Sequence, residues 1–178
     1  MHTEIIDFWF SETTPAQRFT KDVAFDEIIR RRFMNRYLRA RRCELFDWRT
    51  TAQGRLAEII ILDQFPRNMF RDSAEAFATD PLALALAQEG VARGADHELA
   101  PEMKSFFYLP YMHSESLVIH EEARRLYSQE GLEENLKWEI KHQRIIEEFG
   151  RYPHRNQLLG RVSTAAEETF LQQPGSRF

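Results

Sequence analysis

Residues 51 to 65 constrain the fold more than any other segment, because nearly all of their side chains are apolar. The apolar positions are Leu56, Ala57, Ile59, Ile60, Ile61, Leu62 and Phe65. A helix that is apolar on every side lies inside a protein rather than on its surface. We therefore expect a buried central helix over residues 51 to 65, whose polar side chains Glu58, Asp63 and Gln64 are hydrogen-bonded within the protein.

Asp63 sets a second condition on the fold. An ionised carboxylate that is buried without partners costs on the order of several kcal/mol. The sequence therefore predicts that a cation or a set of hydrogen-bond donors lies against Asp63. The arginine-rich segment 149–161 can supply such a cation from the other end of the chain.

The rest of the chain also shows helical spacing. Over residues 24 to 42 the apolar positions recur every four residues and line one face of a helix, at Phe25, Ile29, Phe33 and Tyr37. No convincing strand alternation spans four or more residues. The sequence predicts an all-α fold of six to eight helices, forming a single domain over residues 1–178.

Local signals place several helix ends. Thr14, with Gln17 three residues later, and Thr164, with Glu167, predict capping boxes at helix starts. Asp80 before Pro81 predicts another helix start, and Gly94 predicts the end of that helix. The early aromatic residues Phe8 and Trp9 are expected to be core anchors.

Composition limits the class of protein. The net charge is -4, which disfavours a general nucleic-acid binder. The single cysteine, Cys43, excludes an internal disulfide, and we expect it to be a half-buried, incidental residue. No stretch resembles a signal peptide or approaches the ~18 apolar residues of a membrane span. We expect a soluble, cytoplasmic protein with no membrane partner.

The segment 30–42 holds seven arginines and no acid. A charge run on a helix is usually a solvated face. The alternative is a docking surface for an acidic protein partner or nucleic acid, and this alternative is the basis of an interaction-scaffold hypothesis.

Two similar phrases, LDQFPRNMFR at 62–71 and FGRYPHRNQLLGR at 149–161, each place a proline, an arginine and an asparagine after an apolar segment. Pro66 is expected to end the buried helix at Phe65, because proline lacks a backbone donor. Gly150 and Pro153 are expected to end a helix whose apolar stripe is Trp138, His142, Ile145 and Phe149.

The polar residues of these phrases allow two interpretations. In the structural one, Arg67, Asn68, Arg155 and Asn156 donate hydrogen bonds to the carbonyl groups at the helix ends. In the functional one, the density of cationic side chains forms an anion-binding pocket, because guanidinium groups suit carboxylate and phosphate. The side chains behind this interpretation are Arg151, His154, Arg155 and Arg161, which have no acid among them.

A third phrase, YLPYMHSES at 108–116, bends at Pro110 and places His113 and Glu115 at the start of a helix. His113 and His120 are expected on one helix face, but about 10 Å apart along the axis, too far to share a metal ion. We therefore predict no metal and no cofactor. Ser114 is expected to cap the following helix.

These motifs together resemble a bacterial family catalogued only as domain of unknown function number 924. The resemblance covers nearly the whole chain, from IIDFWF at 5–10 to Phe170 and Leu171. It implies an all-helical fold grouped with tetratricopeptide-like superhelices, and no particular reaction. The 34-residue tetratricopeptide repeat is not visible here. The family's motif positions are Asp63, Gln64, Arg67, Asn68, His113, Glu115, His142, Arg151, His154, Arg155 and Asn156. Cys43 stands where a small residue such as glycine is expected.

Three functional hypotheses follow. The first is a polar pocket, at the meeting point of the three phrases, that binds a small anionic or carboxylate-bearing ligand through Asp63, Arg67, Asn68, His113, Glu115, Arg151, His154, Arg155 and Asn156. The second is an enzyme in which His113, Glu115 or His154 performs acid–base chemistry. The third is a protein–protein interaction scaffold. His142, which lies on an apolar stripe, is interpreted as a buried histidine bonded to a backbone carbonyl or a carboxylate.

Overall fold

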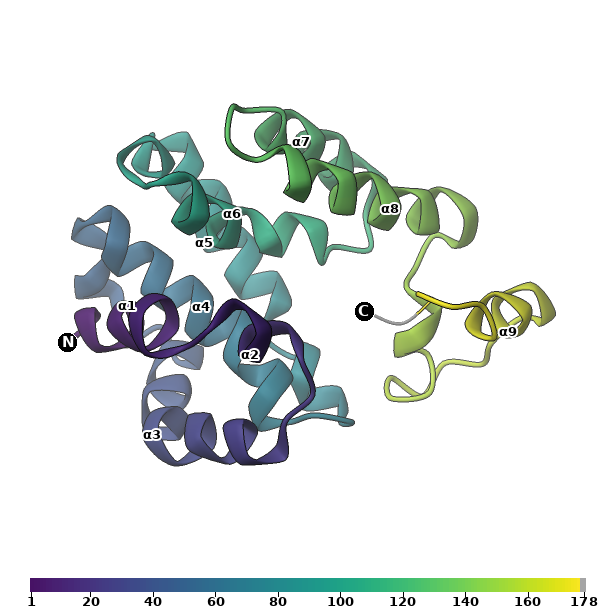
Figure 1. The fold of residues 1–178 in the computed structure, drawn as a ribbon, viewed down its shortest axis with the longest axis horizontal. Helices are drawn as coiled ribbons and strands as arrows, with labels where there is room; N and C mark the ends of the chain where they lie inside the picture. Colours follow the sequence, from purple (N-terminus) through teal and green to yellow (C-terminus); the bar gives the residue numbers. More distant parts are fainter. Residues whose placement is uncertain (177–178) are drawn as a thin grey trace.

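The computed structural model describes residues 1–176, and this part of the chain is helical with no strand (Figure 1). The α-helices are α1 (Thr3–Asp7), α2 (Pro15–Phe19), α3 (Val23–Arg41), α4 (Ala52–Met69), α5 (Asp80–Ala92), α6 (Pro101–Met112), α7 (Leu117–Tyr127), α8 (Glu133–Phe149) and α9 (Ala165–Leu171). The all-α prediction is confirmed. Short helices such as α1 and α2 make the number in residues 1–176 larger than expected.

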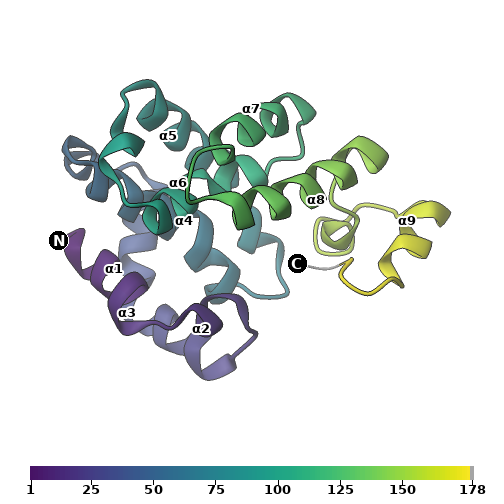
Figure 2. The same cartoon turned by 45° about the horizontal axis from the view of Figure 1, so that its top comes forward.

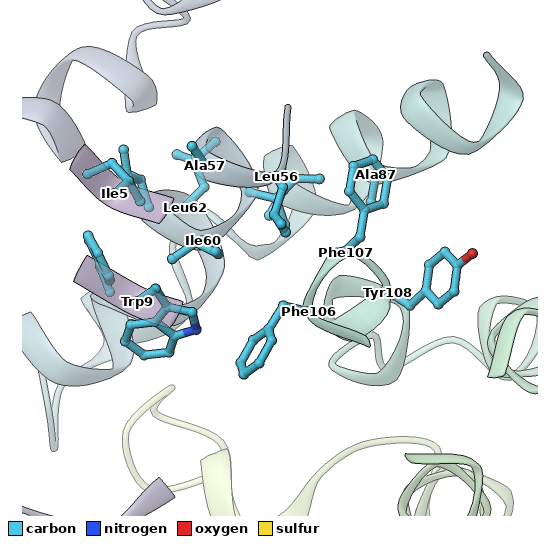
Figure 3. Close-up of a cluster of buried hydrophobic side chains, with 14 of the residues drawn as sticks. Ile5, Trp9, Leu56, Ala57, Ile60, Leu62, Ala87, Phe106, Phe107 and Tyr108 are labelled. Carbon is cyan, nitrogen blue, oxygen red and sulfur yellow. The ribbon is translucent and has the colours of Figure 1, made fainter. Parts of the chain in front are cut away.

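Helix α4 is the central helix, and it packs against α1, α3, α5 and α6. Its side chains Leu56, Ala57 and Ile60 have no exposed surface. Figure 3 shows these side chains between Trp9 on one side and Phe107 of α6 on the other. The predicted buried helix is therefore present, and it places Asp63 in the interior.

Two prolines lie inside helices, which corrects the expected helix ends. Helix α4 continues through Pro66 to Met69, and α6 contains Pro110. Pro66 cannot donate to the carbonyl of Leu62, one turn earlier. The hydroxyl of Thr79 donates to that carbonyl instead, at 2.5 Å. The helix therefore keeps a partner for the acceptor that the proline leaves open.

Helix α3 buries the predicted face, with Phe25, Ile29, Phe33 and Tyr37 all inside. Its arginines are paired with acids of the same chain. Arg32 donates to Glu12 at 2.6 Å, and Arg31 donates to Glu27 at 2.7 Å. Much of the positive charge on this face is therefore neutralised within the protein, which weakens the interaction-scaffold hypothesis.

The predicted capping boxes are present. The hydroxyl of Thr14 accepts from the backbone of Gln17, and the Glu167 carboxylate accepts from the backbone of Thr164 at 2.7 Å. Gly150 ends α8 with a φ of 68°, in the left-handed region that glycine adopts most readily. These ends were predictable because the signals that set them are local.

Two local predictions need correction. Thr79, rather than Asp80, is the residue before α5, and Asp80 is the first helical residue. Cys43 is exposed, not half-buried. Its φ of 59° is positive, which explains why a small residue such as glycine is expected there. Gly94, with a φ of 72°, follows α5 as predicted.

The C-terminal third adds the antiparallel pair α7 and α8, which packs on α6 (Figure 2). The chain after α8 contains a short 3-10 turn, Pro153–Arg155, against which α9 packs. A small apolar cluster of Ile145, Ile146 and Tyr152 lies here. Within residues 1–176, no helix combines the length and the apolar character needed to cross a membrane.

Two further expectations about this region are wrong. Trp138 is 50% exposed and is not part of a buried stripe. His113 and His120 do not share a helix, because α6 ends at Met112 and α7 begins at Leu117. His113 therefore occupies the corner between the two helices.

Candidate functional site

Asp63 is fully buried on α4 and is surrounded by donors. Its Oδ1 lies 2.8 Å from Nδ1 of His113, and its Oδ2 accepts from the Gln64 amide at 2.5 Å. The Arg67 guanidinium lies 3.6 Å from Oδ1. Burial opposes ionisation of this carboxyl, but His113 and Arg67 hold its pKa below the usual range. The predicted partners of Asp63 are thus the His113 imidazole and the Arg67 guanidinium.

Arg67 extends this contact toward α5. It donates to both carboxylate oxygens of Asp80, each at 2.9 Å. Burial disfavours the charged guanidinium, but Asp80 and Asp63 raise the pKa of Arg67. Arg67 therefore stays charged and links the two aspartates.

Arg155, in the turn after α8, also approaches Asp80. Its Nη1 lies 3.5 Å from Oδ2 of Asp80, and its guanidinium stacks on the rings of Phe77 and Tyr152, at 4.7 and 4.6 Å. We call the five residues Asp63, Arg67, Asp80, His113 and Arg155 the Asp63 cluster. It joins α4, the start of α5, the end of α6 and the turn after α8 (Figures 1 and 2).

Three rings border the cluster. The Tyr152 ring lies 5.8 Å from that of His142 and 5.6 Å from that of His154. Burial, together with a smaller effect of the charge of Arg155, lowers the pKa of His142 to about 4 and that of His154 to about 3. Both imidazoles are therefore neutral near pH 7. Nδ1 of His142 donates to the Trp138 carbonyl at 2.8 Å, as the sequence predicted.

A buried pair, His120 and Glu139, lies next to Tyr152, whose ring is 6.3 Å from that of His120. Nδ1 of His120 is 2.7 Å from the Glu139 carboxylate, and Nε2 is 2.8 Å from the carbonyl of Ser114. Burial raises the pKa of Glu139. This pair joins α7 to α8 and holds the corner that carries His113. The Ser114 hydroxyl accepts from the backbone of Ser116, the residue before α7, so it supports that helix start without capping the helix itself.

Glu115 and Asn156, two further candidates, fasten the chain after α8. Arg161 donates to both Glu115 oxygens, at 2.6 and 2.9 Å, and its Nε donates to Asn156 at 2.9 Å. The backbone of Tyr152 also donates to Glu115, at 2.7 Å. These bonds close a loop, from which Arg155 approaches Asp80 of α5 and the Tyr152 hydroxyl donates to the carbonyl of Met112 in α6, at 2.5 Å.

Arg151 and Asn68 are held by partners outside the cluster. Arg151 donates to both oxygens of Glu167, at 2.6 and 2.8 Å. Asn68 donates to Asp26 at 2.8 Å. The structure therefore brings together Asp63, Arg67, His113 and Arg155 from the predicted set, with His154 at the edge.

Sequence reasoning missed two members of the site. The position of Asp80 before Pro81 indicates a helix cap, and nothing in the sequence indicates that it pairs with an arginine. Phe77, which stacks on Arg155, carried no signal at all. Phe77 lies between α4 and α5 and Asp80 is the first residue of α5, in a region that neither proline phrase covers.

Two open hollows in the described part of the chain are lined by residues other than those of the Asp63 cluster. An open hollow of about 460 Å³ is lined by Arg49, Arg55 and Arg93, which already pair with Glu58 and Glu89. Within residues 1–176, no three His, Cys, Asp or Glu side chains are arranged to hold a metal ion. The Asp63 cluster is therefore singled out by its charges and burial.

Comparison with known proteins identifies relatives without assigning an activity. A solved protein of unknown function from Agrobacterium tumefaciens shares 38% sequence identity and a TM-score of 0.88, over 96% of each chain. A search of curated proteins finds no match. The family model described as "Bacterial protein of unknown function (DUF924)" matches residues 5–175. The chain therefore belongs to this bacterial family of unknown function.

Proposed function

We propose that the Asp63 cluster binds a small anion through Arg155, either inorganic phosphate or the carboxylate or phosphate group of a small molecule. The observation that carries this proposal is the state of Arg155. The residue is 7% exposed, and its Nε has no hydrogen-bond partner among residues 1–176. Its polar contact is the 3.5 Å approach to Asp80.

A buried guanidinium needs acceptors, because it carries five N–H donors and a full charge. Leaving such donors unsatisfied costs on the order of 1–3 kcal/mol for each group. Asp80 meets this need only in part, since it lies 3.5 Å from one nitrogen of Arg155 while Arg67 donates to both of its oxygens at 2.9 Å. Burial and the nearby Arg67 lower the pKa of Arg155, as expected for a buried cation that shares its counterion, Asp80, with a second arginine.

Arg18 is a comparable arginine elsewhere in the chain. Its side chain is 4% exposed, and it also lies over two rings, those of Phe10 and Phe106. Its Nε also has no partner among residues 1–176, but its two terminal nitrogens donate to Glu102 at 2.8 Å and to the carbonyl of Thr13 at 3.3 Å, whereas Arg155 has only the 3.5 Å approach to Asp80. The contrast supports an anion as the missing acceptor of Arg155.

The rest of the cluster gives the site access and selectivity. The His113 side chain is 15% exposed and that of Arg67 is 22% exposed, so the cluster reaches solvent. Arg67 and Arg155 are balanced by Asp63 and Asp80, so the site offers donors without a large excess of charge. Such a site favours small anions that accept hydrogen bonds over polyanions.

The test is calorimetric titration with inorganic phosphate and with succinate near pH 7. We expect the wild-type protein to bind at least one of them, and Arg155→Gln to weaken binding by at least ~10-fold, or about 1.4 kcal/mol. Arg18→Gln is the matched control, because it removes an equally buried, ring-stacked arginine far along the chain. It should leave the dissociation constant unchanged.

Arg155→Lys keeps the charge and serves if Arg155→Gln folds poorly. It should bind more weakly than the wild type, because a lysine cannot donate in the planar, two-pronged geometry. The proposal fails if neither anion binds the wild-type protein, or if both Arg155 variants bind as tightly as it does.

A further inference from the structure

We propose that His113 is a general base that activates water against an ester whose anionic group is held by Arg155, with Asp63 as the residue that positions the imidazole. This inference rests on the proposed anion site and names its substrate class: small esters that carry a carboxylate or phosphate group.

The first support is the direction in which the His113 ring is held. Its Nδ1 lies 2.8 Å from the Asp63 carboxylate, which is fully buried and has no proton to give. Nδ1 must therefore carry the hydrogen and donate it to Asp63. In a neutral imidazole the lone pair is then on Nε2, the nitrogen that points away from the carboxylate.

The second support is the setting of Nε2. Nε2 of His113 makes no hydrogen bond within residues 1–176, while 15% of the side chain is exposed. The proton donor that reaches this lone pair is therefore water or a ligand. His120 offers a contrast, since both of its ring nitrogens are engaged inside the protein, by Glu139 and by Ser114.

The third support is electrostatic. Burial and Arg67 lower the pKa of His113, so the ring is in its proton-accepting form near pH 7. When Nε2 takes a proton, the buried carboxylate of Asp63 stabilises the imidazolium that forms. The Asp63 carboxylate thus holds one nitrogen of the imidazole, the other nitrogen is left to accept a proton, and Arg67 lies 3.6 Å from the same carboxylate.

The hydrolysis needs only the ester and one water molecule as reactants. A water molecule gives one proton to Nε2 of His113, and its oxygen lone pair forms a bond to the ester carbonyl carbon. The bond from that carbon to the leaving oxygen breaks, and the imidazolium returns the proton to the leaving oxygen. One ester and one water give one acid and one alcohol.

The experiment uses mono-4-nitrophenyl succinate, an ester with a free carboxylate, and follows the release of 4-nitrophenolate. His113→Gln should lower kcat by roughly 10²-fold or more, the range of general-base catalysis. His97→Gln is the matched control, because His97 also lies near an aspartate, Asp96, but is 77% exposed. It should change the rate by less than about twofold.

Two further variants separate the roles. Arg155→Gln should raise KM about tenfold or more with a smaller effect on kcat, since it removes binding. Asp63→Asn should change the pH profile of kcat/KM, because the amide no longer fixes the proton on Nδ1. Neutral 4-nitrophenyl acetate should react more slowly than the succinate ester and should not respond to Arg155→Gln.

The outcomes distinguish this inference from the proposed anion site. If the wild-type protein binds succinate in calorimetry but does not hydrolyse the ester, or if His113→Gln keeps the wild-type rate, the inference is overturned and the anion site stands. If succinate and phosphate both fail to bind, the anion site itself is overturned. Saturable hydrolysis that is lost in His113→Gln and kept in His97→Gln supports both.

Discussion

Asp63→Ala should lower the free energy of unfolding by about 3–5 kcal/mol, the cost of removing one partner from a buried ionic contact. The substitution leaves the His113 ring, the Gln64 amide and one side of Arg67 without their acceptor. Because these donors stay buried in the centre of the fold, water cannot replace the carboxylate cheaply. Urea unfolding followed by circular dichroism measures the change.

Glu134→Ala is the control for this prediction. Glu134 is also an ion-pair partner, with Lys137, but its side chain is 80% exposed. Exposed pairs contribute about 0–1 kcal/mol, so this variant should stay close to the wild type. Equal losses in the two variants would show that burial of Asp63 does not have the energetic consequence claimed for it.

The protein should lose about 2–4 kcal/mol of stability between pH 7 and pH 5 because of two histidines. In the folded state burial lowers the pKa of His142 to about 4 and that of His154 to about 3, from an ordinary value of 6.5. Between these values and 6.5 the unfolded chain binds more protons than the folded one. Stability is therefore fully present above about pH 6.5 and falls as the pH decreases toward 4 and 3.

Urea unfolding at several pH values between 7.5 and 4.5 measures this loss. The double variant His142→Gln and His154→Gln should show a flatter dependence over the same range, since glutamine does not titrate, and the dependence that remains includes that of His113, whose pKa burial also lowers. The carboxylates act differently: Glu167, whose pKa is lowered to about 2, has its effect at more acidic pH, and Glu139, whose pKa is raised by burial, favours the folded state as the pH falls. A wild-type stability that is constant from pH 7 to pH 5 would contradict the prediction.

The central helix shows which parts of the fold a sequence can predict. The apolar run around Ile59 and Ile60 reports burial directly, because no other environment suits a helix without a polar face. The capping boxes at Thr14 and Thr164 were equally readable, since their partners lie three residues away. The helix through Pro66 was not, because its continuation depends on Thr79, a donor from another helix start.

The candidate site was predictable in its kinds of residue and less so in its pairings. The need of Asp63 for a partner follows from burial alone, and His113 and Arg67 meet it. The choice of partner for each arginine does not follow, because it is made by chain segments that meet only in the folded protein. Arg151 faces Glu167 for this reason, while Arg155, four positions later, reaches Asp80.

The contact between α4 and the start of α5 depends on the missing backbone N–H of Pro66. Because position 66 has no N–H, the Leu62 carbonyl is free to receive Thr79, and the helix that starts there delivers Asp80 to Arg67. Any other residue at this position would restore an ordinary helical bond and compete with Thr79 for the same oxygen. A regular helical hydrogen bond at position 66 would thus weaken the contact between α4 and the start of α5. The ion pair between Arg67 and Asp80 depends on that contact, so a missing backbone donor in α4 helps to hold two helices together.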